Sequence, residues 1–109
     1  MSRFWFLVSD FWFVTPMPVG LLTLEIQFPY AHSLKEKRAV LQKLRGRLRS
    51  RFNVAVAELD RQDAWQHATL AIVTVSASQP LLDSSLRQVL EESERIIGQD
   101  VSNYTLEFY

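Results

Sequence analysis

An α+β fold, with a four-stranded antiparallel sheet and two helices on one of its faces, is what this 109-residue sequence predicts. Three observations lead to it. Four segments have the apolar patterns of strands, apolar residues recur with a helical period in two others, and the order along the chain is β-α-β-β-α-β. This split βαβ order packs both helices on the same sheet face. The length suits one domain with a core of its own.

The first strand and the first helix follow each other directly. Apolar and polar residues alternate over 22–28, and the strand ends before Pro29. Ser33 followed by Glu36 forms a capping box, which predicts the start of a helix. Gly46 lies inside this helix, where glycine costs about 1 kcal/mol relative to alanine. The apolar stripe that the spacing predicts for the helix consists of Leu34, Val40, Leu41, Leu44 and Leu48.

The remaining elements are two strands, a helix and a last strand. Residues 52–59 are rich in valine and small side chains and predict the second strand. Residues 68–76 are apolar on both faces, which is typical of a strand in the middle of a sheet. Pro80 suits the start of the second helix and Gly98 its end. Residues 101–108 then close the sheet as the fourth strand.

The first sixteen residues differ from the rest of the chain. They are too short for a membrane span and carry Asp10 in their middle. Two hypotheses remain for 1–16: an appendage that docks on the domain or a membrane surface, or the product of a start codon placed too far upstream, with Met17 the natural start. We favour the second, so that 17–109 form the single domain. The aromatic residues of this extension are Phe4, Trp5, Phe6, Phe11, Trp12 and Phe13.

The first helix is strongly basic although the formal net charge of the protein is zero. It holds eight of the twelve basic residues, and Glu36 is the only acid between them. They line both sides of the apolar stripe. These eight residues are Lys35, Lys37, Arg38, Lys43, Arg45, Arg47, Arg49 and Arg51.

A row of cations on one helix predicts a polyanionic partner. Lysine and arginine neutralise phosphates and release counterions, so all eight are candidate contacts to the RNA backbone. They would bind it without recognising the base sequence. The alternative is a solvated helix whose cations pair with acids of the second helix or of a partner subunit. The aromatic signature of the RNA-recognition motif is absent from the sequence. Binding would therefore depend on phosphate and shape.

One string of residues, with several shorter matches, resembles a known family. The residues concerned are 21–28, the string Ala-His-Ser-Leu-Lys-Glu-Lys-Arg at 31–38, then 51–54, 57–58, 63 and 65–66. From about residue 17 to 108 the chain is similar to the bacterial YlxP-like family, a domain-of-unknown-function family. The resemblance implies a ferredoxin-like fold, self-association and a bacterial origin. Members are commonly encoded beside translation initiation and ribosome maturation factors, which implies work on the ribosome or its RNA.

An enzyme is the third possibility, based on the start of the first helix. His32, Ser33, Lys35 and Arg38 are candidate anion ligands there, as in acylphosphatases with the same element order. The glycine-rich loop of those enzymes is missing, however, and Ser33 is explained as a helix cap. No acid stands at a spacing that would orient His32, and the chain has no cysteine. We expect no catalysis, no cofactor and no metal.

Self-association is the alternative to RNA binding. The sheet face away from the helices is predicted to present Thr23, Glu25, Gln27, Ala55 and Ala57, and small side chains there favour a homodimer. Trp65 is a candidate interface anchor, or else it caps the core. Glu58 is a second interface candidate; it pairs with Arg51 or Arg61, or marks a recognition site. We expect a cytoplasmic protein without a membrane contact.

Overall fold

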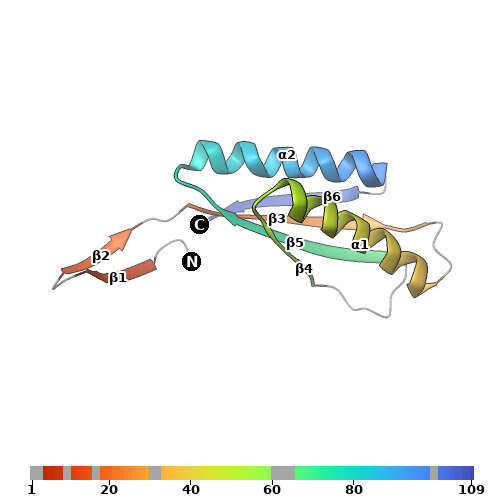
Figure 1. The fold of residues 1–109 in the computed structure, drawn as a ribbon, viewed down its shortest axis with the longest axis horizontal. Coiled ribbons are helices and arrows are strands. Elements are labelled where there is room, and N and C mark those ends of the chain that lie inside the picture. The colour runs from red at the N-terminus through yellow and green to blue at the C-terminus, as the bar shows by residue number, and fades with distance from the viewer. Residues whose placement is uncertain (1–3, 9–10, 16–17, 30–32, 60–65, 99–100) are drawn as a thin grey trace.

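A computed structural model describes residues 4–8, 11–15, 18–29, 33–59, 66–98 and 101–109. It confirms the α+β prediction: a four-stranded antiparallel sheet carries two helices on one face (Figure 1). The strand order is β4-β5-β3-β6, which is that of the ferredoxin-like fold. The elements are β1 (Phe4–Val8), β2 (Phe11–Thr15), β3 (Val19–Gln27), α1 (Leu34–Arg51), β4 (Ala55–Glu58), β5 (His67–Val75), α2 (Gln79–Ile97) and β6 (Val101–Phe108).

The two central strands define the register of the sheet. β3 pairs with β5 along its whole length, from Val19 opposite Val75 to Gln27 opposite His67. On the other side β3 pairs with β6. Because side chains alternate between the faces, one set of β3 residues points to the helices and the other set points away. The two helices therefore share one core and leave the second sheet face uncovered.

The core lies between the helices and the sheet. Leu22, Leu24 and Ile26 of β3 are fully buried in it. Gly20 continues this row, and a Cβ atom there would lie 2.5 Å from the Leu86 side chain of α2. The glycine thus allows α2 to approach the sheet closely. The other buried apolar residues of the core are Phe28, Leu41, Leu44, Leu48, Ala68, Leu70, Ile72, Leu82, Leu86, Val89 and Leu90.

The buried row of α1 differs from the predicted stripe at its beginning. Leu34 is 39% exposed and Val40 is 37% exposed, so neither belongs to the core. Lys37 takes that place and is fully buried, ahead of Leu41 and the two following leucines. Its spacing of four from Leu41 puts it on the same face. The predicted stripe was defined by apolar residues alone, so it did not include Lys37.

Both helices begin as the sequence predicts. The Ser33 hydroxyl accepts a hydrogen bond from the Glu36 backbone N–H at 3.3 Å, and Ser78 does the same for Leu81 at 3.4 Å. At the far end of α1 the helix continues to Arg51 and Phe52 caps it. The strand predicted over 52–59 is consequently shorter and covers Ala55–Glu58.

The N-terminal extension contains two strands that the sequence analysis did not predict. β1 and β2 pair antiparallel with each other in a separate two-stranded sheet. In Figure 1 this hairpin extends away from the helices and the larger sheet. Neither hypothesis about its origin is tested by this arrangement.

We expect substitution by alanine to have opposite effects at two glycines, one inside α1 and one at the end of α2. Gly46→Ala is expected to stabilise the protein by about 1 kcal/mol, because alanine is the better helix former and a Cβ there would meet no atom within 4 Å. Gly98→Ala is expected to destabilise it by about 1 kcal/mol, because Gly98 ends α2 with a positive φ of 76°. Urea unfolding of both variants measures the difference, and shifts of the same sign would contradict it.

Candidate nucleic-acid interface

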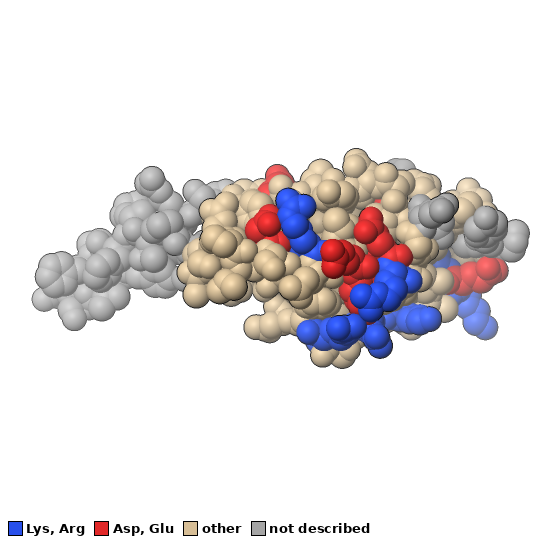
Figure 2. All heavy atoms as spheres, turned by 90° about the horizontal axis from the view of Figure 1, so that it is seen from above, with Lys and Arg blue, Asp and Glu red and all other residues tan. Residues whose placement is uncertain are grey.

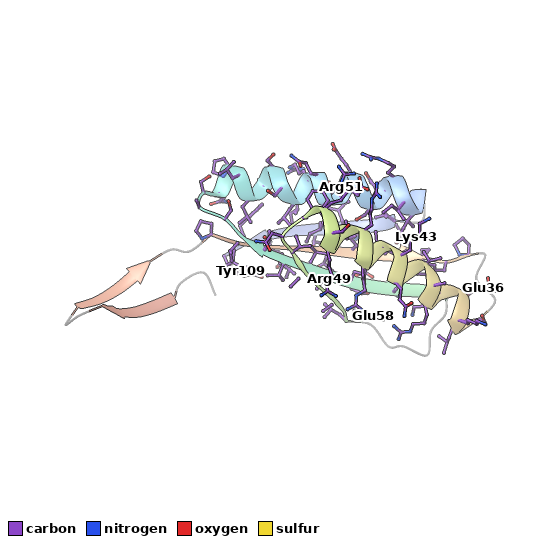
Figure 3. All side chains as sticks on the ribbon, in the orientation of Figure 1. Glu36, Lys43, Arg49, Arg51, Glu58 and Tyr109 are labelled. Atoms are coloured by element: carbon purple, nitrogen blue, oxygen red, sulfur yellow. The ribbon has the colours of Figure 1, made fainter. Side chains whose placement is uncertain are left out.

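Helix α1 presents its cations along two sides of its buried row. Figure 3 shows Lys43 and Arg51 toward α2, and Arg49 with Glu58 on the opposite side, toward β4. The helical period explains this division, since residues four apart share a side. Each side meets one acidic residue of a neighbouring element. The two acids, Glu92 of α2 and Glu58 of β4, therefore decide which cations are neutralised inside the protein.

Glu92 forms ion pairs with three arginines where α1 packs against α2. Its Oε2 accepts a hydrogen bond from Arg47 Nε at 2.9 Å. Its Oε1 lies 3.2 Å from Arg51 Nη1 and 3.1 Å from Arg95 Nη1. The Glu92 side chain is only 3% exposed, whereas those of the arginines are 46% to 67% exposed. The guanidinium groups are thus held by one buried carboxylate while much of each faces solvent.

The ionisation of Glu92 depends on these arginines. The hydrogen bond from Arg47 holds the pKa of Glu92 below its ordinary value. Burial acts in the opposite direction and raises the pKa, while the charges of Arg51, Arg95 and Arg47 lower it further. The carboxylate stays ionised at neutral pH. The cluster as a whole therefore keeps an excess of positive charge.

Acid is expected to destabilise the protein through Glu92. Because its pKa is lower in the folded state, its contribution is complete above the ordinary value of 4.5 and is lost as the pH falls through the folded value. We expect the urea midpoint of Glu92→Gln to fall less steeply below pH 4.5 than that of the wild type. Glu94→Gln, an exposed change on the same helix, should keep the wild-type slope. Equal slopes for wild type and Glu92→Gln would contradict the assignment.

Glu58 neutralises two cations at the beginning of α1. Its Oε1 accepts a hydrogen bond from Arg38 Nη1 at 2.6 Å, and its Oε2 lies 3.5 Å from Lys37 Nζ. Lys37 is fully buried and the Glu58 side chain is 5% exposed, while Arg38 is 35% exposed. Glu58 lies on the helix-facing side of β4, so it contacts α1 and is not open to a partner. Of the two partners predicted for Glu58, Arg51 is wrong because it binds Glu92, and Arg61 lies outside the described residues.

The other four cations of α1 are available to solvent. Lys35, Lys43 and Arg49 are exposed, and Arg45 is half-buried. Among the described residues no carboxylate lies within ion-pair distance of these four side chains. Figure 2 shows lysines and arginines gathered along one side of the helical layer, with acids nearer the middle. Of the eight candidate contacts to RNA, Lys37 is fully buried and cannot reach RNA, and the exposed charge is concentrated in the second half of α1.

The candidate anion site at the start of α1 is only partly described. His32 lies outside the described residues, as does Trp65, the candidate interface anchor. Ser33 Oγ caps the helix by accepting from Glu36, and Arg38 is bound to Glu58. Lys35 remains exposed. The described residues therefore bring no converging anion ligands together at this helix start.

Sequence reasoning missed the residues that organise the basic surface. Glu92 and Arg95 belong to α2, and no spacing in the sequence links them to Arg47 or Arg51. One signal was present for Glu92: it follows Val89 by three residues, which places it next to the core-facing side of α2. An acid at such a position predicts a cation on the element packed against it. Only the fold shows which cation this is.

The uncovered face of the sheet combines a small polar cluster with an apolar patch. Glu25 Oε1 lies 2.9 Å from His67 Nε2 and accepts a hydrogen bond from Thr69 at 2.8 Å. Glu25 is thus an acidic neighbour of His67 on this face. Toward the other end of the strands, Val73 is 37% exposed and Val75 is 55% exposed. Their apolar or small neighbours on this face are Val19, Leu21, Ala55, Ala57 and Ala71.

No group of three or more histidine, cysteine, aspartate or glutamate side chains in the described ranges could hold a metal ion. Neither of the two helices that the structure describes has the length and apolar character that a membrane span requires.

Known proteins resemble this chain in structure and in sequence. The designed protein Ferredog-Diesel superposes with a TM-score of 0.53 at 16% identity, covering 82% of this chain and 83% of that one. The crystal structure of a putative antibiotic biosynthesis monooxygenase from Bordetella bronchiseptica superposes with a TM-score of 0.51 at 13% identity. The match covers 84% of this chain and 94% of that one. At these identities the likeness supports the ferredoxin-like fold alone.

The sequence matches are more specific. The uncharacterized protein YlxP of Bacillus subtilis (strain 168) is 39% identical over 72 residues, which cover 66% of this chain and 78% of that protein. The family model described as "Protein of unknown function (DUF503)" matches residues 19–105. The match begins at the first strand of the larger sheet and runs into its last strand. The chain therefore belongs to the DUF503 family, which includes YlxP-like proteins.

Proposed function

We propose that this protein is a non-enzymatic, cytoplasmic accessory module that binds the phosphate backbone of ribosomal RNA or of a ribosome assembly intermediate through α1. One observation carries the proposal: four cations on one helix have no carboxylate neighbour among the described residues. These residues are Lys35, Lys43, Arg45 and Arg49. The ribosomal target is suggested by the genes that commonly neighbour this family.

The internal carboxylates support this proposal because they fix the basic surface. Glu58 and Glu92 hold the ends of α1 against β4 and α2, so the exposed cations project from a helix that is anchored on both sides. Groups already held in place lose less conformational entropy on binding. The charge that remains exposed would attract a polyanion in a manner that weakens steeply with salt. Such a surface would follow the shape of RNA without reading its bases.

Co-sedimentation with ribosomal subunits over a series of salt concentrations tests the proposal. Each phosphate contact raises the binding constant by a factor of about five to eight at 0.1 M salt. We therefore expect Arg45→Gln combined with Arg49→Gln to weaken binding about 25- to 60-fold. Arg87→Glu changes the net charge equally, by two units, but lies on α2 in a pair with Asp83, and it should bind like the wild type. Equal binding of all three proteins, or none by the wild type, would overturn the proposal.

A homodimer formed through the uncovered sheet face is the second candidate. The observation that favours it is the apolar patch around Val73 and Val75, which lies beside small alanine side chains. A flat face of this kind can pack against its own copy about a twofold axis. Such a dimer would place two copies of α1 on its outer sides, since the helices cover the opposite face. As an interaction module without nucleic acid, the dimer would be insensitive to salt.

Sedimentation velocity distinguishes the dimer from a monomer. We expect a dimer for the wild type and a monomer for Val73→Lys, because a lysine in the middle of the patch would have to be desolvated in the interface. Leu81→Lys is the control, since Leu81 is 58% exposed at the start of α2, on the other side of the molecule. A wild-type monomer, or a Val73→Lys protein that remains dimeric, would exclude this interface.

A further inference from the structure

The outward side of α1 is hollowed on both flanks of Gly46. A hollow of about 600 Å³ lies toward α2, and Lys43, Arg47 and Arg95 line it. A second hollow of about 290 Å³ lies on the other flank, lined by Arg45 and Arg49. Gly46 and Gln42 border both hollows. We call this arrangement the Gly46 saddle: Gly46, with three cations on one flank and two on the other.

Gly46 is not required by the fold of this chain. Its backbone is helical, and a Cβ atom there would meet nothing within 4 Å. A glycine in a helix interior is unfavourable relative to alanine. Glycine is nevertheless suited to one purpose here, which is to let another molecule approach the backbone closely. Because Gly46 has no side chain, the helix backbone is uncovered between the two hollows that it lines.

The charge of the saddle selects an anion. Among the described residues, five cations surround Gly46, and Glu92 is the one acid that lines either hollow. Glu92 binds Arg47 and Arg95, yet both side chains remain more than half exposed, at 52% and 67%. On the other flank Arg45 Nε is buried and has no hydrogen-bond partner among the described residues. A buried donor without an acceptor is costly, so the Arg45 side chain would gain a partner by turning outward to a phosphate.

From this geometry we propose that a phosphodiester backbone crosses α1 at Gly46. One phosphate is held in the larger hollow by Lys43, Arg47 and Arg95, and the next along the strand is held by Arg45 and Arg49. The strand itself passes over the glycine, where a side chain would block it. This inference rests on the proposed RNA binding and assigns it a place on the helix.

A steric substitution tests the saddle without changing its charge. Gly46→Leu should weaken binding of a fluorescently labelled ribosomal RNA fragment at least tenfold in an anisotropy titration, because the isobutyl group occupies the crossing point. Ala39→Leu is the matched control: Ala39 is also exposed on α1, two turns earlier and outside both hollows. It should bind within twofold of the wild type. Unchanged binding by Gly46→Leu would overturn the saddle.

Two further measurements separate the possible failures. Leucine is a better helix former than glycine, so the circular dichroism and urea midpoint of Gly46→Leu should match or exceed the wild type. If the variant fails to fold, Gln42→Trp replaces it, since Gln42 borders both hollows and the larger indole ring would obstruct them, and unchanged binding by that variant would overturn the saddle instead. A wild type that binds no RNA overturns both proposals. Binding that Arg45→Gln with Arg49→Gln weakens but Gly46→Leu leaves unchanged overturns the saddle alone.

Discussion

Replacing Glu58 with alanine is expected to destabilise the protein by about 3 kcal/mol or more. This is the lower end of the range measured when one partner of a buried ion pair is removed. Lys37 is fully buried and its Nζ lies 3.5 Å from Glu58. Without the carboxylate, the buried ammonium group loses a charge that neutralises it. Arg38 contributes less to the loss, because it is 35% exposed and can turn to solvent.

Urea unfolding followed by circular dichroism measures this effect. Glu107→Ala is the control, because Glu107 is an exposed acid on β6, and it should change the free energy of unfolding by less than about 0.5 kcal/mol. A double variant, Lys37→Met with Glu58→Leu, should recover most of the loss, since apolar residues of similar volume often replace a buried pair without penalty. A Glu58→Ala protein within about 1 kcal/mol of the wild type, or a double variant as unstable as the single one, would show that the pair does not hold α1 to β4.

Periodicity in the sequence was sufficient to predict the architecture. Strand β3 alternates strictly, Ser33 and Ser78 cap the two helices, and Gly98 ends α2. These signals are local, and the structure confirms them together with the α+β class. The hairpin of β1 and β2 was not predicted, because its segments are almost entirely apolar and lack the alternation seen in β3.

The candidate site was harder to predict because its organisation is long-range. The sequence identified all the cations of α1 but could not tell paired from unpaired ones. Glu58 is 20 residues from Arg38, and Glu92 is 45 residues from Arg47. Only the packing of β4 and α2 against α1 brings these groups together. Lys37 illustrates the limit, since a charged residue within a basic run predicts exposure unless its buried partner is known.

The second large effect concerns two arginines on the same side of α1. Arg38 and Arg49 have the same chemistry and contribute the same formal charge. Arg38 donates to Glu58 at 2.6 Å, whereas Arg49 is exposed and has no carboxylate partner among the described residues. Arg38 would have to give up that interaction to reach a phosphate, because only 35% of its side chain is exposed, whereas Arg47 and Arg95 remain more than half exposed beside Glu92. Of Arg38 and Arg49, only Arg49 should therefore contribute to binding RNA.

Comparison of Arg49→Gln with Arg38→Gln tests most directly whether internal carboxylates decide which cations bind RNA. The measurement is the anisotropy titration of a labelled ribosomal RNA fragment over several salt concentrations. We expect Arg49→Gln to weaken binding about five- to eightfold at 0.1 M salt and to make the slope of log K against log salt shallower by about one. Arg38→Gln should remain within twofold of the wild type. Equal losses in the two variants, or a larger loss for Arg38→Gln, would contradict the account.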